Sequence, residues 1–488
     1  MPVLRLEQPL TVDIVAAAVR NHHTAVISPT IRDTVPRLHK AMLKKSASEK
    51  VYGINTGFGP MVTENIPPAN QQQLQYNLIR SHACGVGSPL PPDLVRAIIL
   101  TRLNTLHQNY SAVSLEALTA LQVFFNSGFI PYIPKHGSVG ASGDLIQLAH
   151  IALCLIGEGH LVDDLGTLKK TSQILKKHTI LPLALTGRDG LALINGTGAM
   201  TGIAAIVLAD SKKLIENCIT LSAMLYTIFS VNTEHIDPLV ALVRPHHGQK
   251  HVAEKLRSLI KYSSVNTTSL QAVYSLRCVP QILGPIFETL ENAIKITNIE
   301  LNSVTDNPLF GLENNVVHNG NFHGDYIAHE MDKVRIGLTK ASILMERQLN
   351  FLVNPKLNGI LPPYVNRNTP GIDLALQAVQ FVATSTTAEN QTLSHPLVTH
   401  SIPTNNDNQD VVSMGCNSAL LTNQVLQNCF TVQATLALTV LEAIDVANVT
   451  LPPTLRAFYK KLRACSKPLT SDRPLYEDLS RIAATLTH

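Results

Sequence analysis

Long segments with helical periodicity are the feature that most limits what this chain can fold into. In five segments the apolar residues recur at intervals of three and four, the spacing that places them on one face of an α-helix. These segments are 94–106, 115–125, 203–225, 331–352 and 419–449. The last of them is long enough to be a central helix of a bundle. Strand-like runs are few and short, and no regular alternation of strands and helices is visible. The sequence therefore predicts a mainly α fold.

Charge, cysteine content and apolar runs restrict the partners and the location. The net charge is only +4, and the lysines and arginines are scattered, whereas binding to nucleic acid needs a basic stripe. The seven cysteines lie far apart without a C-x-x-C pair, which favours free thiols in a reducing compartment. The start of the chain lacks a signal-peptide pattern, and the apolar stretch 434–449 is interrupted by Glu442 and Asp445,. We therefore expect a cytoplasmic protein that binds neither nucleic acid nor membrane.

Seven polar, irregular stretches separate the helical segments. Binding and catalytic side chains are concentrated on such loops when a rigid scaffold holds them. We therefore expect the loops to build one composite site. They are residues 52–60, 137–144, 195–198, 271–277, 305–308, 319–324 and 407–415.

The loop GSVGASGDL, which begins at Gly137, is the most informative of the seven. A simple helix N-cap would explain its serine or its aspartate. A phosphate-binding loop would need a Walker lysine, and a serine nucleophile would need G-x-S-x-G spacing; the loop has neither. A fourth interpretation is chemical: in a tight turn the amide nitrogen of Gly143 attacks the carbonyl carbon of Ala141. Loss of two waters, one of which takes the Ser142 hydroxyl, leaves a five-membered ring with an exocyclic methylene. Gly143 suits this role because it has no Cβ to block the approach.

This loop and the motifs around it resemble the aromatic amino acid lyase family, which includes histidine, phenylalanine and tyrosine ammonia-lyases and related 2,3-aminomutases. In that family Ala-Ser-Gly cyclises to 4-methylideneimidazole-5-one (MIO). The similar motifs keep the family's order, from YGINTGFG at Tyr52 to NQDVVSMG, which ends at Gly415. The resemblance implies that MIO forms from Ala141, Ser142 and Gly143 and makes the substrate amine a better leaving group. It implies no external cofactor and no metal.

The resemblance also assigns roles to residues of this chain. Tyr52 matches the catalytic base, which must lose its proton and would be helped by the positive ends of nearby helices. Asn195 matches the asparagine that binds the MIO oxygen, and Tyr274 matches a second catalytic tyrosine. Arg277 matches the arginine that pairs with the substrate carboxylate, for which its planar fork is suited. The remaining substrate-binding residues that it implies are Gly59, Ser81, His82, Asn321, Phe322, Asn408 and Gln409.

Two positions bear on which amino acid is the substrate. His82, in RSHACG, is similar to histidine lyases and to some tyrosine lyases and tyrosine aminomutases, and an imidazole can hydrogen-bond a phenol or another imidazole. Histidine lyases carry a glutamate where this chain has Gln409. Together the two positions favour L-tyrosine, with trans-p-coumarate and ammonia as products. Histidine ammonia-lyase and tyrosine 2,3-aminomutase remain the alternatives, and a catalytically inactive helical scaffold is the alternative from another class.

By resemblance, residues 1–200 form an N-terminal domain that carries the MIO. Residues 201–488 form a long central helical bundle with C-terminal helices. The resemblance also implies an intertwined homotetramer in which each site draws residues from three subunits. Three histidines, His246, His247 and His251, fit no zinc spacing, and we expect them in a solvated loop.

Overall fold

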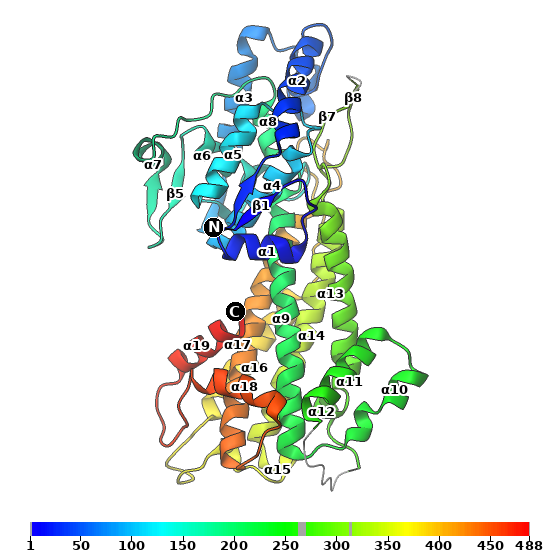
Figure 1. Ribbon diagram of the computed structural model, residues 1–488, viewed down its shortest axis with the longest axis vertical. Helices are drawn as coiled ribbons and strands as arrows, with labels where there is room; N and C mark the ends of the chain where they lie inside the picture. The colour runs from blue at the N-terminus through cyan, green and yellow to red at the C-terminus, as the bar shows by residue number, and fades with distance from the viewer. Residues whose placement is uncertain (1, 262–269, 312–314, 488) are drawn as a thin grey trace. The chain divides into compact units, whose positions relative to one another are not determined.

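The computed structural model describes residues 2–261, 270–311 and 315–487 and is mainly helical (Figure 1). The strands are short and form four two-stranded sheets: β1 (Val3–Arg5) pairs in parallel with β2 (Thr24–Val26), and the other three pairs are antiparallel. The antiparallel pairs are β3 (Val86–Pro89) with β4 (Pro134–His136), β5 (His160–Val162) with β6 (Leu168–Lys170), and β7 (Leu309–Phe310) with β8 (Val316–Val317). The predicted mainly α class is therefore confirmed.

The chain divides into two compact units, each assembled from three segments. Unit 1 comprises residues 1–209, 294–332 and 396–420, and unit 2 comprises residues 210–293, 333–395 and 421–488. The predicted boundary between residues 200 and 201 stays a prediction.

Unit 1 is built around a helix that is buried on all sides. This helix, α4 (Pro92–His107), buries every residue from Leu94 to His107, and it contacts α1 and α5. Serine caps shape the surrounding helices, as at Ser114, whose Oγ accepts the Ala117 N–H at the start of α5,. The helices that lie wholly in this unit are α1 (Val12–Arg20), α2 (Pro29–Ser46), η1 (Gly59–Thr63), α3 (Pro68–His82), α5 (Leu115–Ser127), α6 (Leu145–Leu155), α7 (Thr171–Lys177) and α8 (Asp189–Ile194).

Long helices make up the core of unit 2, as the periodicity predicts. Side chains join them through buried hydrogen bonds: Gln433 of α17 donates to the Leu214 carbonyl of α9, and Gln348 of α14 donates to Ser222 of α9. The long helices are α9 (Gly198–Phe229), α13 (Val279–Leu301), α14 (Asp325–Val353) and α17 (Gly415–Val446). The shorter ones are η2 (Thr233–Ile236), α10 (Pro238–Val243), α11 (His247–Ile260), α12 (Tyr274–Arg277), α15 (Pro355–Asn358), η3 (Pro363–Val365), α16 (Gln377–Leu393), α18 (Pro453–Arg463) and α19 (Tyr476–Thr487).

Helix α17 is long and apolar enough to cross a membrane by length and composition alone. Within the protein, however, 83% of its apolar window is buried. A helix that other helices cover in this way belongs to a protein core.

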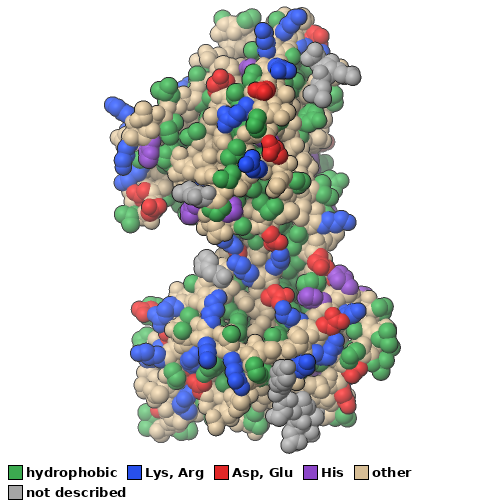
Figure 2. Space-filling model, in the orientation of Figure 1, with side chains coloured by type: hydrophobic (Ala, Val, Ile, Leu, Met, Phe, Trp, Pro, Cys, Tyr) green, Lys and Arg blue, Asp and Glu red, His purple; other side chains and the backbone are tan. Residues whose placement is uncertain are grey.

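Charged side chains of both signs are scattered over the visible surface, and no basic stripe gathers on that face (Figure 2).

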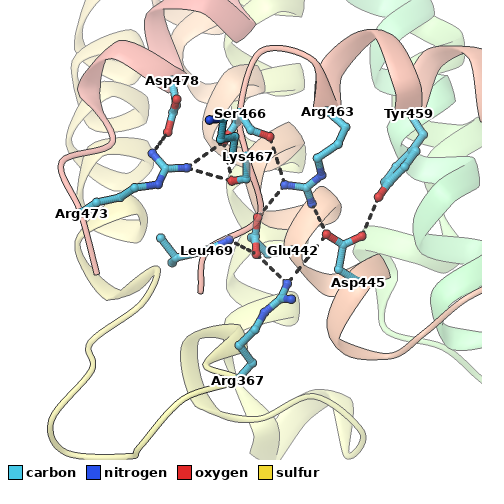
Figure 3. A network of polar contacts seen from close by, with 10 residues as sticks. All are labelled: Arg367, Glu442, Asp445, Tyr459, Arg463, Ser466, Lys467, Leu469, Arg473 and Asp478. Carbon is cyan, nitrogen blue, oxygen red and sulfur yellow. Dashed lines mark hydrogen bonds and ion pairs between the residues drawn. The ribbon is translucent and has the colours of Figure 1, made fainter. Parts of the chain in front are cut away.

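A network of ion pairs fastens the C-terminal segment of unit 2 to α17 (Figure 3). Glu442 of α17 pairs with Arg463 and Arg367 at 2.7 and 2.9 Å, and Asp445 pairs with Arg463 at 2.7 Å. Tyr459 of α18 also donates to Asp445 of α17. The charges are shared among several partners, so no carboxylate in this network depends on a single arginine.

The structure differs from the predicted loops in two places. Residues 271–277 include the short helix α12, and His246 to His251 form the N-cap and first turn of α11. Helix α11 forms because Val252, Ala253, Leu256 and Ile260 make a buried face with helical spacing,. The expectation of a loop at the three histidines was therefore wrong: His247 lies against Glu288 and Glu291, and His251 stacks on Phe287.

Candidate active site

Six of the seven polar loops meet at one cavity of about 960 Å³ in unit 1. Only the loop at 271–277, which belongs to unit 2, contributes nothing to its lining. We call this space the loop cavity. The loop residues that line it are Tyr52, Phe58, Gly59, Ala141, Ser142, Asn195, Asn307, Gly320, Phe322, His323, Asn408, Gln409, Asp410 and Val411.

The Ala-Ser-Gly turn forms part of the wall of the loop cavity. Gly140, just before the turn, and Gly143, its last residue, adopt φ of +74° and +69°, values that favour glycine,. A Cβ on Gly143 would collide with the carbonyl of Gly196, so only glycine fits there. The Asp144 N–H donates to the same carbonyl at 2.8 Å. The turn is therefore tightly constrained on the side of residue 143.

The segment just before α17 holds the other side of the turn. The Ser413 hydroxyl donates to the Gly140 carbonyl at 3.1 Å, and the Met414 N–H donates to the Val139 carbonyl at 2.9 Å. Ser413 is completely buried. These two bonds join segments that lie more than 270 residues apart in the sequence.

Asn195, at the end of α8, faces the turn from inside the protein. Its Nδ2 donates to the Ser142 carbonyl oxygen at 3.2 Å, and its side chain is buried. That carbonyl oxygen is the atom that cyclisation would retain as the carbonyl oxygen attached to the new ring. The role that the family resemblance implies for Asn195 stays a prediction.

Tyr52 lies in the loop cavity with its phenol oxygen bound to the backbone. The Gly59 N–H donates to this oxygen at 3.0 Å. Gly59 adopts φ of +53°, and a Cβ there would collide with Asn405. Phe58 packs edge-on against the Tyr52 ring with 6.0 Å between centroids. Gly59 thus acts through its amide and its small size.

His82 ends α3 and lines the same cavity, with one ring nitrogen engaged by the backbone. Its Nδ1 lies 2.9 Å from the Leu78 carbonyl oxygen, and a carbonyl only accepts hydrogen bonds,. The Nδ1 atom therefore carries the proton, and in the neutral ring Nε2 is a hydrogen-bond acceptor. Ser81 also donates to the Leu78 carbonyl, at 3.1 Å, and its hydroxyl lies beside Nδ1.

Gln409 reaches the turn from the loop before α17. Its Nε2 donates to the Ser142 hydroxyl at 3.2 Å, while its Oε1 accepts from the Thr404 hydroxyl at 2.8 Å. The Thr404 bond holds the Gln409 side chain beside the turn. A neutral donor therefore stands where a glutamate would present a negative charge.

Four predicted site residues are absent from the lining of the loop cavity: Gly143, the last residue of the turn, and Asn321, Tyr274 and Arg277. Asn321 lines a separate cavity of about 480 Å³, and its Nδ2 donates to the Val304 carbonyl. Tyr274 and Arg277 belong to unit 2, where the Tyr274 side chain is 74% exposed. Their predicted roles stay predictions. Phe322, Asn408 and Ser81 do line the loop cavity.

Sequence reasoning missed Asn307 and Asn405, both of which line the loop cavity. Asn307 lies in the stretch 305–308, which was recognisable as a polar loop but carried no motif that assigned a role. Asn405 was not distinguishable from its neighbours by type or spacing. Only the structure singles out Asn405, because it places this side chain against Gly59.

Two buried charged groups set the electrostatics behind the turn. Burial raises the pKa of Asp144 to about 7, although the Met200 N–H at 2.7 Å partly offsets the effect. Burial also lowers the pKa of Arg102 to about 10, so this arginine stays protonated at neutral pH. Its guanidinium packs against Gly196, the residue after Asn195. Positive charge therefore lies close to the asparagine that binds the Ser142 carbonyl.

A helical scaffold with an Ala-Ser-Gly turn in the wall of a polar cavity is the arrangement of one class of enzyme. The chain belongs to the aromatic amino acid lyase family: the family's sequence profile, described as "Aromatic amino acid lyase", matches residues 10–464. It is accordingly a carbon–nitrogen lyase of the ammonia-lyase family. The resemblance predicted from the motifs is confirmed.

The relatives carry both histidine and tyrosine names. The chain is 37% identical to a probable histidine ammonia-lyase of Thermoplasma volcanium over 97% of this chain and 96% of the relative. It is also 37% identical to the MIO-dependent tyrosine 2,3-aminomutase of Streptomyces globisporus over 90% and 86%. A crystal structure of tyrosine aminomutase from that organism matches with a TM-score of 0.94 and 34% identity, over 100% of this chain and 97% of that one. The comparisons therefore identify the family and leave the substrate open.

Proposed function

We propose that this protein is an MIO-dependent ammonia-lyase that converts L-tyrosine to trans-p-coumarate and ammonia. The observation that carries the choice of tyrosine is that His82 and the neutral amide Gln409 line the same cavity as Ser142. The amide presents no negative charge to a protonated imidazole, which favours a phenol over histidine. With Nδ1 of His82 engaged by the Leu78 carbonyl, Nε2 is the acceptor that remains, and a phenol O–H is a matching donor. A site built to hydrogen-bond a hydroxyl discriminates strongly against a substrate that lacks it. Phenylalanine offers no such donor.

The residues of the turn fit the formation of MIO. Formation requires the Gly143 nitrogen to bond to the Ala141 carbonyl carbon; the Ala141 oxygen leaves as water with the two amide protons of Ser142 and Gly143. The second water takes the Ser142 hydroxyl and the Ser142 Cα proton. Three features support this reaction. Gly140 and Gly143 have positive φ, a Cβ at Gly143 would collide with Gly196, and Asn195 donates to the Ser142 carbonyl. Once formed, the group supplies an electrophilic methylene that activates the substrate amine for departure.

The chain's own residues perform the remaining steps. Tyr52 takes the β-proton, and the Gly59 N–H supports the charge on its oxygen,. Asn195 donates to the oxygen derived from Ser142 and so stabilises negative charge there,. Gln409 donates to the Ser142 hydroxyl and so orients the Ser142 side chain. Because these side chains come from loops of unit 1, they are held on one rigid scaffold.

The substrate carboxylate is bound by Arg277 and Asn321, with Tyr274 close to the amine. We propose that a homotetramer brings these residues to the loop cavity from other subunits. Two facts support the proposal: Tyr274 is largely exposed on a short helix, and neither Tyr274 nor Arg277 lines the cavity of its own unit 1. In this assembly residues 1–200 carry the MIO and residues 201–488 supply the bundle, and the enzyme acts in the cytoplasm.

Tyrosine 2,3-aminomutase is the second candidate, favoured by the name of the Streptomyces globisporus relative. It requires the same site and differs in that ammonia returns to the β-carbon. The assay therefore offers tyrosine, histidine and phenylalanine separately, follows acrylate absorbance, and examines the mixture by NMR for a β-amino acid. We expect p-coumarate as the main product. Urocanate as the main product would overturn the choice of tyrosine, and β-tyrosine would identify the mutase.

Three variants test the basis of the assignment. Ser142→Ala should abolish turnover, and intact-mass measurement should find the wild type lighter than its translated sequence by two waters and the variant not dehydrated. His82→Leu should lower kcat/KM for tyrosine by about 100-fold relative to phenylalanine, because Nε2 is lost. Gln409→Glu is the companion variant and should shift the preference toward histidine. An unchanged tyrosine-to-phenylalanine ratio in His82→Leu would show that another group reads the ring.

A further inference from the structure

A buried ion pair lies directly behind Asn195. Arg188, the residue before α8, and Asp306, in the loop after α13, are both completely inaccessible to solvent. The two side chains meet through two parallel hydrogen bonds, from Nη1 to Oδ2 at 3.0 Å and from Nη2 to Oδ1 at 3.1 Å. This bidentate geometry is the strongest form of an arginine–carboxylate contact. Nη2 also donates to the Asn307 carbonyl at 2.9 Å.

The ion pair holds the backbone amide that orients Asn195. The Asn307 N–H lies 2.8 Å from Asp306 Oδ1 and 2.9 Å from Asn195 Oδ1. An N–H only donates, so the atom of Asn195 that faces it must be the oxygen. The NH₂ group of Asn195 must then point the other way, and there it meets the Ser142 carbonyl at 3.2 Å.

The direction of this amide matters for the chemistry of the turn. If the Asn195 side chain were rotated by 180°, its oxygen would face the Ser142 carbonyl oxygen and repel it. The side chain has no charge that would select one orientation. The selection therefore comes from the Asn307 N–H, whose position depends on bonds from Asp306 and Arg188 on either side of the same peptide segment.

We propose that the Arg188–Asp306 ion pair is a positioning device that fixes the Asn195 amide with its NH₂ group toward the Ser142 carbonyl. The ion pair touches neither substrate nor the turn, so it acts only through Asn195. This inference rests on the proposed function, since Asn195 has a catalytic role only if the turn carries the reactive group. Breaking a buried pair is costly to stability, and the test must therefore separate positioning from folding.

Arg188→Lys is the main variant, because lysine keeps the charge but cannot form the fork and the Asn307 contact together. We expect kcat to fall by about 10- to 100-fold, with KM little changed. One donor of this kind raises kcat by about 10²–10³-fold, and a misdirected Asn195 amide loses part of that contribution. Intact mass should show a smaller fraction of dehydrated protein. Asp306→Asn, a nearly isosteric change, is the second variant and should act in the same direction.

The decisive measurement repeats Arg188→Lys in an Asn195→Ala background. If the ion pair acts through Asn195, Arg188→Lys should lower neither kcat nor the dehydrated fraction any further there. A structural role alone would give the same fold-decrease in both backgrounds and would overturn the proposal. Full kcat and full dehydration in folded Arg188→Lys would also overturn it.

Arg463→Lys provides the matched control, because it makes the same substitution in the ion-pair network of unit 2 (Figure 3). We expect it to lower the melting temperature and to leave kcat and dehydration unchanged. A wild-type protein of full translated mass that lacks lyase activity would refute the proposed function itself. That outcome is distinct from a dehydrated, active wild type whose Arg188 variants show no coupling to Asn195.

Discussion

The protein contains two networks of arginine and carboxylate side chains that differ in what surrounds them. In unit 1, Arg188 and Asp306 are both fully buried and form one bidentate pair with each other. In unit 2, Glu442 and Asp445 share Arg463 and Arg367, whose side chains are 13% and 27% exposed. The first lies between loops at the site, whereas the second fastens helices.

The difference indicates how the same chemistry can serve two purposes. A shared and partly solvated network tolerates the loss of one bond, which suits the attachment of a C-terminal segment to α17. A single buried bidentate pair has one geometry, which suits the orientation of a neighbouring amide. Substitutions in the Arg188–Asp306 pair should therefore change catalysis, and substitutions in the network around Glu442 and Asp445 should change stability.

The largest effect on catalysis should come from Tyr52→Phe in unit 1. Removal of the phenol hydroxyl eliminates the proposed base, and we expect kcat to fall by about 10²–10⁴-fold. The melting temperature and the dehydrated mass should stay close to those of the wild type, since the loss is one partly buried hydrogen bond, from the Gly59 N–H. Steady-state kinetics with tyrosine measure the change. Retention of more than a tenth of the activity would show that another group takes the proton.

The matching test in unit 2 is Glu442→Ala. Glu442 is 2% exposed, and its removal takes one of two carboxylate partners from Arg463 and Arg367 and the acceptor from the buried Leu469 N–H. We expect the free energy of unfolding to fall by about 3–5 kcal/mol, as measured by chemical denaturation. The folded fraction should keep the kcat and the dehydrated mass of the wild type. A fall in kcat in that fraction would contradict the division of roles between the two networks.

The smallest effect concerns pH and the buried Asp144. Its folded pKa of about 7 lies above the ordinary value of 3.8, so between these values the folded state keeps a proton that the unfolded state releases. Stability should therefore decrease as pH rises from about 4 to 7, by at most about 1.4 kcal/mol per pH unit from this group. Glu300, whose pKa is also raised by burial, adds to the same trend.

The measurement compares Ser142→Ala with Ser142→Ala/Asp144→Asn, so that neither protein undergoes dehydration at the turn. Chemical denaturation at several pH values between 4 and 7 should give a flatter stability profile for the double variant. Identical profiles would show that the Asp144 carboxyl does not titrate in this range.

The sequence alone predicts the features that depend on nearby residues. The apolar spacing of 203–225 and 419–449 predicts α9 and α17 because a helix is defined by contacts three and four positions apart. The Ala-Ser-Gly motif is likewise three adjacent residues, so the turn was recognisable. Even local reasoning failed at 246–251, where charged and histidine residues hid the buried face that begins at Val252.

The orientation of the site residues could come only from the tertiary structure. The Nδ1 proton of His82 follows from the Leu78 carbonyl, which helical geometry brings close, but the cavity that Nε2 faces is made by loops from distant segments. The direction of the Asn195 amide depends on Asn307, 112 positions away, and on an ion pair that joins residues 118 positions apart. Residue types and spacings identify which groups are present, whereas hydrogen-bond direction depends on which donor lies opposite each acceptor, and only the folded chain brings those atoms together.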